Sequence, residues 1–105
     1  MIAATIQIDF NGSCFIDSQN RPVESARMLA DAAVEAVRSG VLVTMDFRAL
    51  PSVSSSYFNM LLSRIADECG TMPFSQNRIV FRFSSGAQKV IFDRSYLAVI
   101  GGRLQ

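Results

Sequence analysis

Apolar residues alternate with polar ones in two parts of the chain, a spacing typical of β-strands. The alternation over Ala4–Phe10 predicts a half-buried strand, and the Asn11-Gly12 dipeptide after it is typical of a two-residue hairpin turn. We therefore expect Ser13–Asp17 to return as a second strand. The alternation over Arg78–Phe83 predicts another strand that carries its large apolar side chains on one face.

A continuous apolar run distinguishes Val41–Phe47 from these segments. A short run rich in β-branched residues is typical of a strand that is buried on both faces of a sheet. The link after it contains Pro51, which a strand ladder does not accommodate, and then leads to three serines, Ser54–Ser56. We call these three residues the serine turn.

Three segments have the spacing of a helix with one apolar face. The first, Pro22–Ser39, begins with a proline suited to the first helical turn and ends at Gly40, and an Arg27–Asp31 ion pair is expected on it. The second begins at the serine turn, and the third covers Gln88–Leu97. The apolar stripes are Ala26, Leu29, Ala30, Ala33 and Val37 in the first helix, and Phe58, Leu61, Leu62, Ile65 and Cys69 in the second. In the third helix Val90 and Ile91 share a stripe that Arg94 and Leu97 would extend.

Strands that alternate with helices predict an α/β fold with parallel neighbouring strands. The expected order is β-β-α-β-α-β-α, with a loop between Glu68 and Asn77. The length of 105 residues suits a single domain over residues 1–105.

Charge and composition exclude several classes of function. The net charge is +1 and no basic run is present, so we expect no nucleic-acid partner. No apolar run approaches the roughly 20 residues that cross a bilayer, and the N-terminus does not resemble a signal peptide, so we expect a cytoplasmic protein without a membrane partner. Cys14 and Cys69 are expected to be two separate thiols.

Histidine is absent, which excludes Ser-His-Asp catalysis, Cys-His catalysis and histidine-ligated zinc. The glycines match neither the dinucleotide-binding nor the P-loop spacing. We therefore expect no enzymatic activity, no metal and no cofactor. For Asp46, at the end of the central strand, we expect hydrogen bonds to backbone amides of the following loop. A cluster of Asp46 with Asp9 and Asp17 around a metal or phosphate is the alternative.

The serine turn has two interpretations that the residues alone leave open. One serine side chain can cap the free backbone N–H groups at the start of a helix. The same N–H groups and the positive end of the helix also favour an anion such as a phosphate. One helix needs only one cap, so three consecutive serines exceed that requirement. Tyr57, Asn59 and Met60 fall between the apolar and polar faces, and we expect them to be partly exposed beside the serines as an interaction patch.

The segment Val41–Leu62 resembles the STAS family, the domain of bacterial anti-sigma factor antagonists and of sulfate transporter tails, and in particular its divergent STAS-like branch of unknown function. Asp46-Phe47-Arg48 stands where that family has Asp-Leu-Ser, and residues 54–59 align without a gap with Asp-Ser-Ser-Gly-Leu-Gly. Three positions depart from the pattern: Ser54 replaces the acid, and Tyr57 and Asn59 replace the two glycines.

The resemblance implies a mixed sheet of about four strands with helices mainly on one face. It implies that Ser55, or Ser56 after it, is a phosphorylation site, with Asp46 as a supporting acid. It also implies a non-enzymatic regulatory module that docks on a protein partner, a histidine-kinase-type ATPase. The docking residues would be Pro51, Ser54, Ser55, Ser56, Tyr57, Asn59 and Met60. The alternative is a small-ligand or nucleotide sensor of the same fold, with its ligand at the strand ends.

Overall fold

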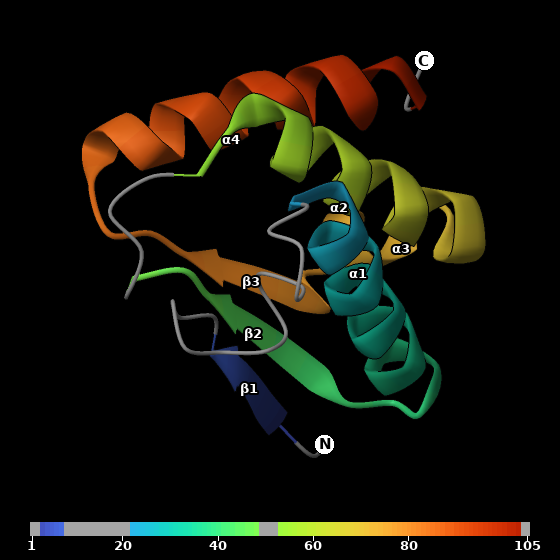
Figure 1. The fold of residues 1–105 in the computed structure, drawn as a ribbon. Coiled ribbons are helices and arrows are strands. Elements are labelled where there is room, and N and C mark those ends of the chain that lie inside the picture. The colour runs from blue at the N-terminus through green and yellow to red at the C-terminus, as the bar shows by residue number, and fades with distance from the viewer. Residues whose placement is uncertain (1–2, 8–21, 49–52, 104–105) are drawn as a thin grey trace.

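The computed structural model describes residues 3–7, 22–48 and 53–103, and it has the α/β fold that the alternating pattern predicts (Figure 1). In this part of the chain a three-stranded parallel sheet has the order β1-β2-β3. The strands are β1 (Ala3–Gln7), β2 (Leu42–Asp46) and β3 (Ile79–Arg82). The helices are α1 (Pro22–Arg38), α2 (Ser55–Cys69), α3 (Met72–Ser75) and α4 (Gly86–Val99), and a 3₁₀ turn follows at Gly101–Arg103.

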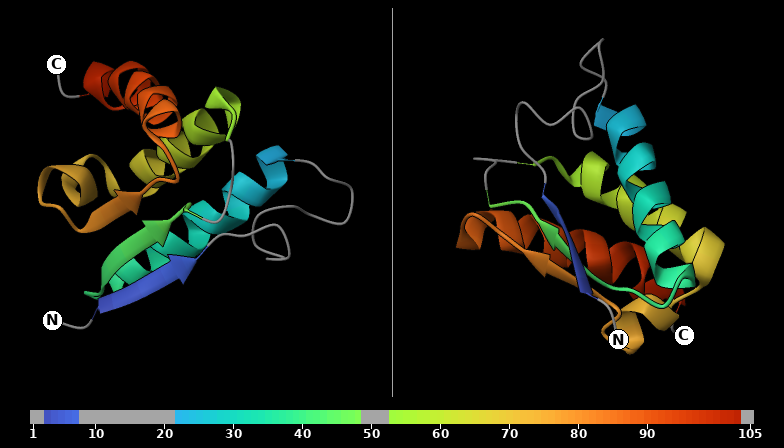
Figure 2. Two further views of the ribbon diagram at one scale, coloured as in Figure 1. Left: turned by 90° about the vertical axis from the view of Figure 1, so that its left-hand side faces the viewer. Right: turned by 90° about the horizontal axis from the view of Figure 1, so that it is seen from below.

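Each strand lies beside the strand that follows it along the chain. Thr5 is opposite Thr44 in one pair, and Met45 is opposite Phe81 in the other. Right-handed crossovers between sequential parallel neighbours place the connecting helices on one face of the sheet. Figure 2 shows the helices gathered on one face in this way. β2 is therefore the central strand of the described sheet, as predicted.

The expected burial of both faces of β2 is correct for one face only. Val43, Met45 and Phe47 point to the helices and have no exposed surface. Leu42 and Thr44, on the opposite face, are only half-buried. The reason is the one-sided helical layer, which excludes water from a single face of the sheet.

The two long helices follow their predicted apolar stripes closely. In α1 the stripe is buried and Val34 joins it. Helix α1 packs chiefly against α2 and less against β2. In α2 the residues Phe58, Leu61, Leu62 and Ile65 have no exposed surface. Gly40 and Gly70 end these helices in the left-handed region, at φ 79° and 68°.

An aromatic cluster joins the sheet to α2 and α4. The Phe47 ring lies parallel to the rings of Phe81 and Phe83, at centroid distances of 6.5 Å from each. It meets the Phe58 ring edge-on at 5.4 Å. Phe92 of α4 closes the cluster, 4.5 Å from Phe81 and 5.2 Å from Phe58. Such tilted and edge-on contacts add to the free energy gained from burial.

The predicted stripe of α4 is correct only at Ile91, which is half-buried against the core. Val90 and Leu97 are 49% and 74% exposed, and Arg94 is exposed as well. The buried residues are instead Phe92, which enters the aromatic cluster, and the polar Gln88 and Ser95. Both polar side chains are satisfied by hydrogen bonds: the Gln88 Oε1 accepts from the Ser84 N–H, and the Ser95 Oγ donates to the Ser55 carbonyl.

One other expectation differs from the structure. The predicted loop between Glu68 and Asn77 contains the short helix α3, whose Phe74 lies 5.8 Å from Tyr96 of α4. Several expectations concern residues outside the described part of the chain. They are Asp9, Asn11-Gly12, the second strand Ser13–Asp17 with Cys14 and Asp17, and Pro51. Cys69 is a free, half-buried thiol.

Candidate functional site

The serine turn begins α2, and its three hydroxyl groups have different environments. Ser54 is the N-cap: its backbone is extended, and its Oγ accepts a hydrogen bond from the Tyr57 N–H at 3.2 Å. Ser55 and Ser56 are exposed, and neither hydroxyl makes a hydrogen bond within the described part of the chain. The cap is therefore supplied by Ser54, and two hydroxyl groups remain exposed at the positive end of the helix.

Tyr57 anchors this turn to the core, so the expectation that it is partly exposed is wrong. Only 1% of its surface is exposed, and its ring meets the Phe47 ring edge-on at 6.3 Å. Phe47 directly follows β2, so this contact holds the end of the central strand and the start of α2 together. Of the other docking candidates, Asn59 is exposed and Met60 is half-buried against the core.

α4 supports the serine turn from a second direction. The Ser95 Oγ donates to the Ser55 carbonyl oxygen at 3.4 Å. Phe58, one turn after Ser55 in α2, also packs edge-on against Phe92, one turn before Ser95 in α4. In Figures 1 and 2 the start of α2 lies beside α4. The sequence gives no sign of this contact, because a serine inside a helix usually faces solvent.

Asp46 and Arg48 form a tight pair at the end of β2. The Asp46 carboxylate accepts from the Arg48 backbone N–H at 2.9 Å, from its Nε at 3.0 Å and from its Nη2 at 2.8 Å. The expected bond to a loop amide is therefore present. The hydrogen bonds from the Arg48 guanidinium hold the pKa of Asp46 below its usual range; burial acts in the opposite direction, and the charge of Arg82 adds to the lowering.

No hydrogen bond joins Asp46 to the serine turn within the described residues. Its observed partners are those of an acid that fixes the exit from β2. A role as supporting acid for a modified serine remains a prediction.

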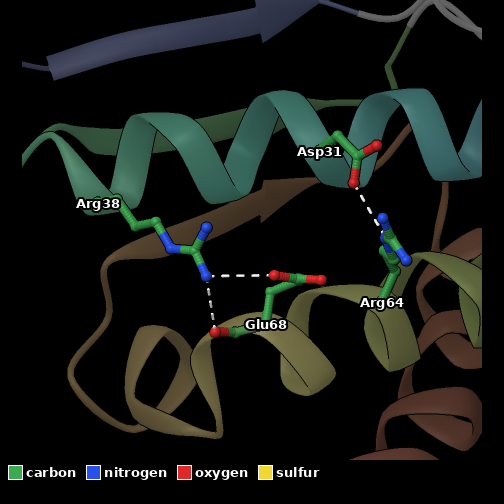
Figure 3. A network of polar contacts seen from close by, with 4 residues as sticks. All are labelled: Asp31, Arg38, Arg64 and Glu68. Atoms are coloured by element: carbon green, nitrogen blue, oxygen red, sulfur yellow. Dashed lines mark hydrogen bonds and ion pairs between the residues drawn. The ribbon is translucent and has the colours of Figure 1, made fainter.

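A groove of about 410 Å³ lies between α1 and α2, away from the serine turn. Two ion pairs cross it, Asp31–Arg64 at 3.0 Å and Arg38–Glu68 at 3.2 Å (Figure 3). Arg38 also donates to the Glu68 carbonyl oxygen at 3.1 Å, in the last turn of α2, where a cation is favoured. These side chains are largely exposed, so we interpret the groove as a bridged helix–helix contact.

The Asp31–Arg64 ion pair corrects an expectation about α1. Asp31 bonds Arg64 on the neighbouring helix, whereas a pair with Arg27 on its own helix was expected. The sequence favoured the local pair because residues one turn apart always lie on the same helical face. The close approach of α1 and α2 brings Arg64 within reach instead.

Neither a metal site nor a membrane span is found in the described part of the chain. Among residues 3–7, 22–48 and 53–103, no three acidic or cysteine side chains come together as metal ligands. No helix there is long and apolar enough to cross a bilayer. Searches of family models, of curated proteins and of solved structures found no match to this chain.

Proposed function

We propose that the chain is a regulatory protein-interaction module of the STAS-like type, without enzymatic activity, that docks on a protein partner through the first turn of α2. The observation that carries this proposal is the difference in role between the three serines of the serine turn. Ser54 caps the helix, whereas the hydroxyl groups of Ser55 and Ser56 are exposed and make no hydrogen bond to a described residue. Two hydroxyl groups that the fold does not need are thus available to a partner or to a modifying enzyme.

The rigid support of the turn favours docking without rearrangement. Tyr57 fixes the turn to the end of β2, and Ser95 fixes it to α4. A surface held from two sides loses little conformational entropy when it binds. The docking surface consists of Ser55, Ser56 and Asn59 with the edge of Met60, and Tyr57 acts as its buried anchor.

Phosphorylation of Ser55 or Ser56 would regulate this docking. A phosphate adds nearly two negative charges and three acceptor oxygens. The first N–H groups and the positive end of α2 would stabilise these charges, so the modified domain would keep its fold. A partner that fits the neutral turn would instead have to desolvate the phosphate, which weakens the complex.

The fold contributes a weaker argument for the STAS-like assignment. A central parallel strand, a short link and a serine-capped helix follow one another as in that family's pattern. The mixed four-stranded sheet is part of the proposal, with Ser13–Asp17 as its additional strand. The partner we propose is a histidine-kinase-type ATPase, which would also supply the phosphate.

The test is capture of a partner from the native cytosol on immobilised chain, with intact-mass measurement of the recovered chain. We expect added phosphate on a serine. We also expect Ser55→Asp and Ser56→Asp to weaken the captured complex roughly tenfold or more, because each places a charge in the contact. Ser55→Ala should preserve the complex, and the matched control is Ser75→Asp, an exposed serine on α3.

Two results together would remove the proposal. One is that both aspartate variants bind the partner as tightly as the wild-type chain and the Ser75→Asp control. The other is that no phosphate is found on any serine. The serine turn would then be a helix cap and nothing more.

A further inference from the structure

Two arginines flank Asp46 at the carboxyl end of the parallel sheet. Arg82 of β3 is the register partner of Asp46 in β2, so the two side chains leave the sheet on the same face. This face is opposite to the one on which Phe47 and Phe81 enter the core. Arg48 lies two residues beyond Asp46 and bonds its carboxylate. Arg48 therefore bonds this carboxylate directly, and Arg82 stands beside it in the sheet, near enough for its charge to lower the pKa of Asp46.

The charges of this cluster do not balance. Asp46 is only 6% exposed and is neutralised by Arg48 through the Nε and Nη2 donors. Arg82 is exposed and makes no ion pair within the described part of the chain. One positive charge therefore remains in this cluster. The Arg48 side chain is 60% exposed, and its Nη1 donors make no hydrogen bond to a described residue.

Three backbone N–H groups near this end of the sheet are already bonded. The Ser84 N–H, just after β3, is bonded by the Gln88 Oε1, and the Gln88 N–H is bonded by the Ser85 Oγ. At the start of α2 the Tyr57 N–H is bonded by the Ser54 Oγ. An anion that approached the face of the sheet that carries Asp46 would meet the guanidinium groups of Arg48 and Arg82 as exposed, charged donors.

We infer that Arg48 and Arg82 bind the phosphate group of a small phosphate monoester at the carboxyl ends of β2 and β3. Guanidinium groups present planar pairs of N–H donors that match the oxygens of a phosphate. A phosphate has enough oxygens to accept from two guanidinium groups at once. The carboxyl ends of parallel strands are also the usual place for ligands in α/β sheets. This site is separate from docking at the serine turn and does not depend on it.

The test is titration of the full-length, ¹⁵N-labelled chain with inorganic phosphate at neutral pH and low salt, followed by NMR. We expect saturable shifts of the backbone and Nε–H signals of Arg48 and Arg82. Arg82→Gln should weaken phosphate binding at least about tenfold, because a charge-assisted pair is lost. Arg48→Gln should weaken it to a similar extent. The matched control, Arg94→Gln, removes an exposed arginine of α4 and should leave the affinity unchanged.

Acetate serves as the comparison anion, because it has one charge and only two oxygens. We expect it to bind clearly more weakly than phosphate, and we expect added sodium chloride to weaken both. The inference is overturned if phosphate gives no saturable shifts at these arginines. It is also overturned if Arg94→Gln weakens binding as much as Arg82→Gln, or if acetate binds as tightly as phosphate.

Discussion

The three serines of the serine turn are predicted to differ sharply when each is replaced by alanine. Ser54→Ala removes the Oγ that accepts from the Tyr57 N–H at 3.2 Å. Loss of an N-cap costs about 1 kcal/mol, with a range of about 0.5–2 kcal/mol. Tyr57 is buried, so its N–H is poorly placed to bond water instead, which favours the upper half of that range. Ser55→Ala and Ser56→Ala remove exposed hydroxyls and should stay within about 0.5 kcal/mol of the wild-type chain.

The assay is urea unfolding of the wild-type chain and of the three variants, at one pH and one salt concentration. If the free energy of unfolding falls with urea concentration at the same slope in all four proteins, the differences in midpoint reflect stability alone. In thermal unfolding, about 1 kcal/mol corresponds to about 4–8 °C for a domain of this size. A loss of stability in Ser55→Ala or Ser56→Ala as large as that in Ser54→Ala would contradict this prediction. In that case the hydroxyls treated as available to a partner would be structural.

Two further predictions concern the core and the pH dependence of stability. Leu62→Ala removes a side chain with no exposed surface and should lower the free energy of unfolding by about 2–5 kcal/mol. The control is Met28→Ala, at a 55% exposed position. Equal shifts in melting temperature for the two variants would show that Leu62 does not face the core. The lowered pKa of Asp46 adds stability that is fully present above its unfolded-state pKa, about 3.9, and is lost as the pH falls through the folded-state pKa. In Asp46→Asn the free energy of unfolding, measured with urea, should therefore fall less steeply below about pH 4 than in the wild-type chain. The same fall in both chains would contradict this prediction.

The helix of the serine turn could be predicted from the sequence because local signals and the apolar spacing agree there. Ser54 is a preferred N-cap residue, and the stripe from Phe58 to Ile65 fixes the buried face. The burial of Tyr57 was missed because it stands directly before Phe58, at the border of the stripe. The Phe47 ring extends the core to that border, which is a tertiary contact.

The buried face of α4 could not be predicted from the sequence, for a different reason. Its apolar residues are spread around the helix, so spacing alone does not select a buried face. The Ser85-x-x-Gln88 spacing was a usable signal, because it is typical of a helix start and places the beginning at Gly86. The burial of Gln88 and Ser95 depends on partners in other segments, Ser84 and Ser55, which no pattern within the helix contains.

The sequence contains a weak signal for the helix α3. Pro73 stands in its first turn, where proline is favoured, although the segment also reads as a loop after Gly70. Only four residues are helical, and their position follows from the packing of Phe74 against Phe81 and Tyr96. Short elements of this kind are determined by the core they cover more than by their own residues.

The most direct test of the central proposal is to map the surface that the captured partner covers. Amide hydrogen exchange of the full chain, alone and in the complex, reports this residue by residue. We expect the protection gained in the complex to be concentrated on the first turns of α2, over residues 55–60, and to be lost when Ser55 is phosphorylated. Protection confined to the α1–α2 groove or to the outer face of α4, with no change at residues 55–60, would contradict it.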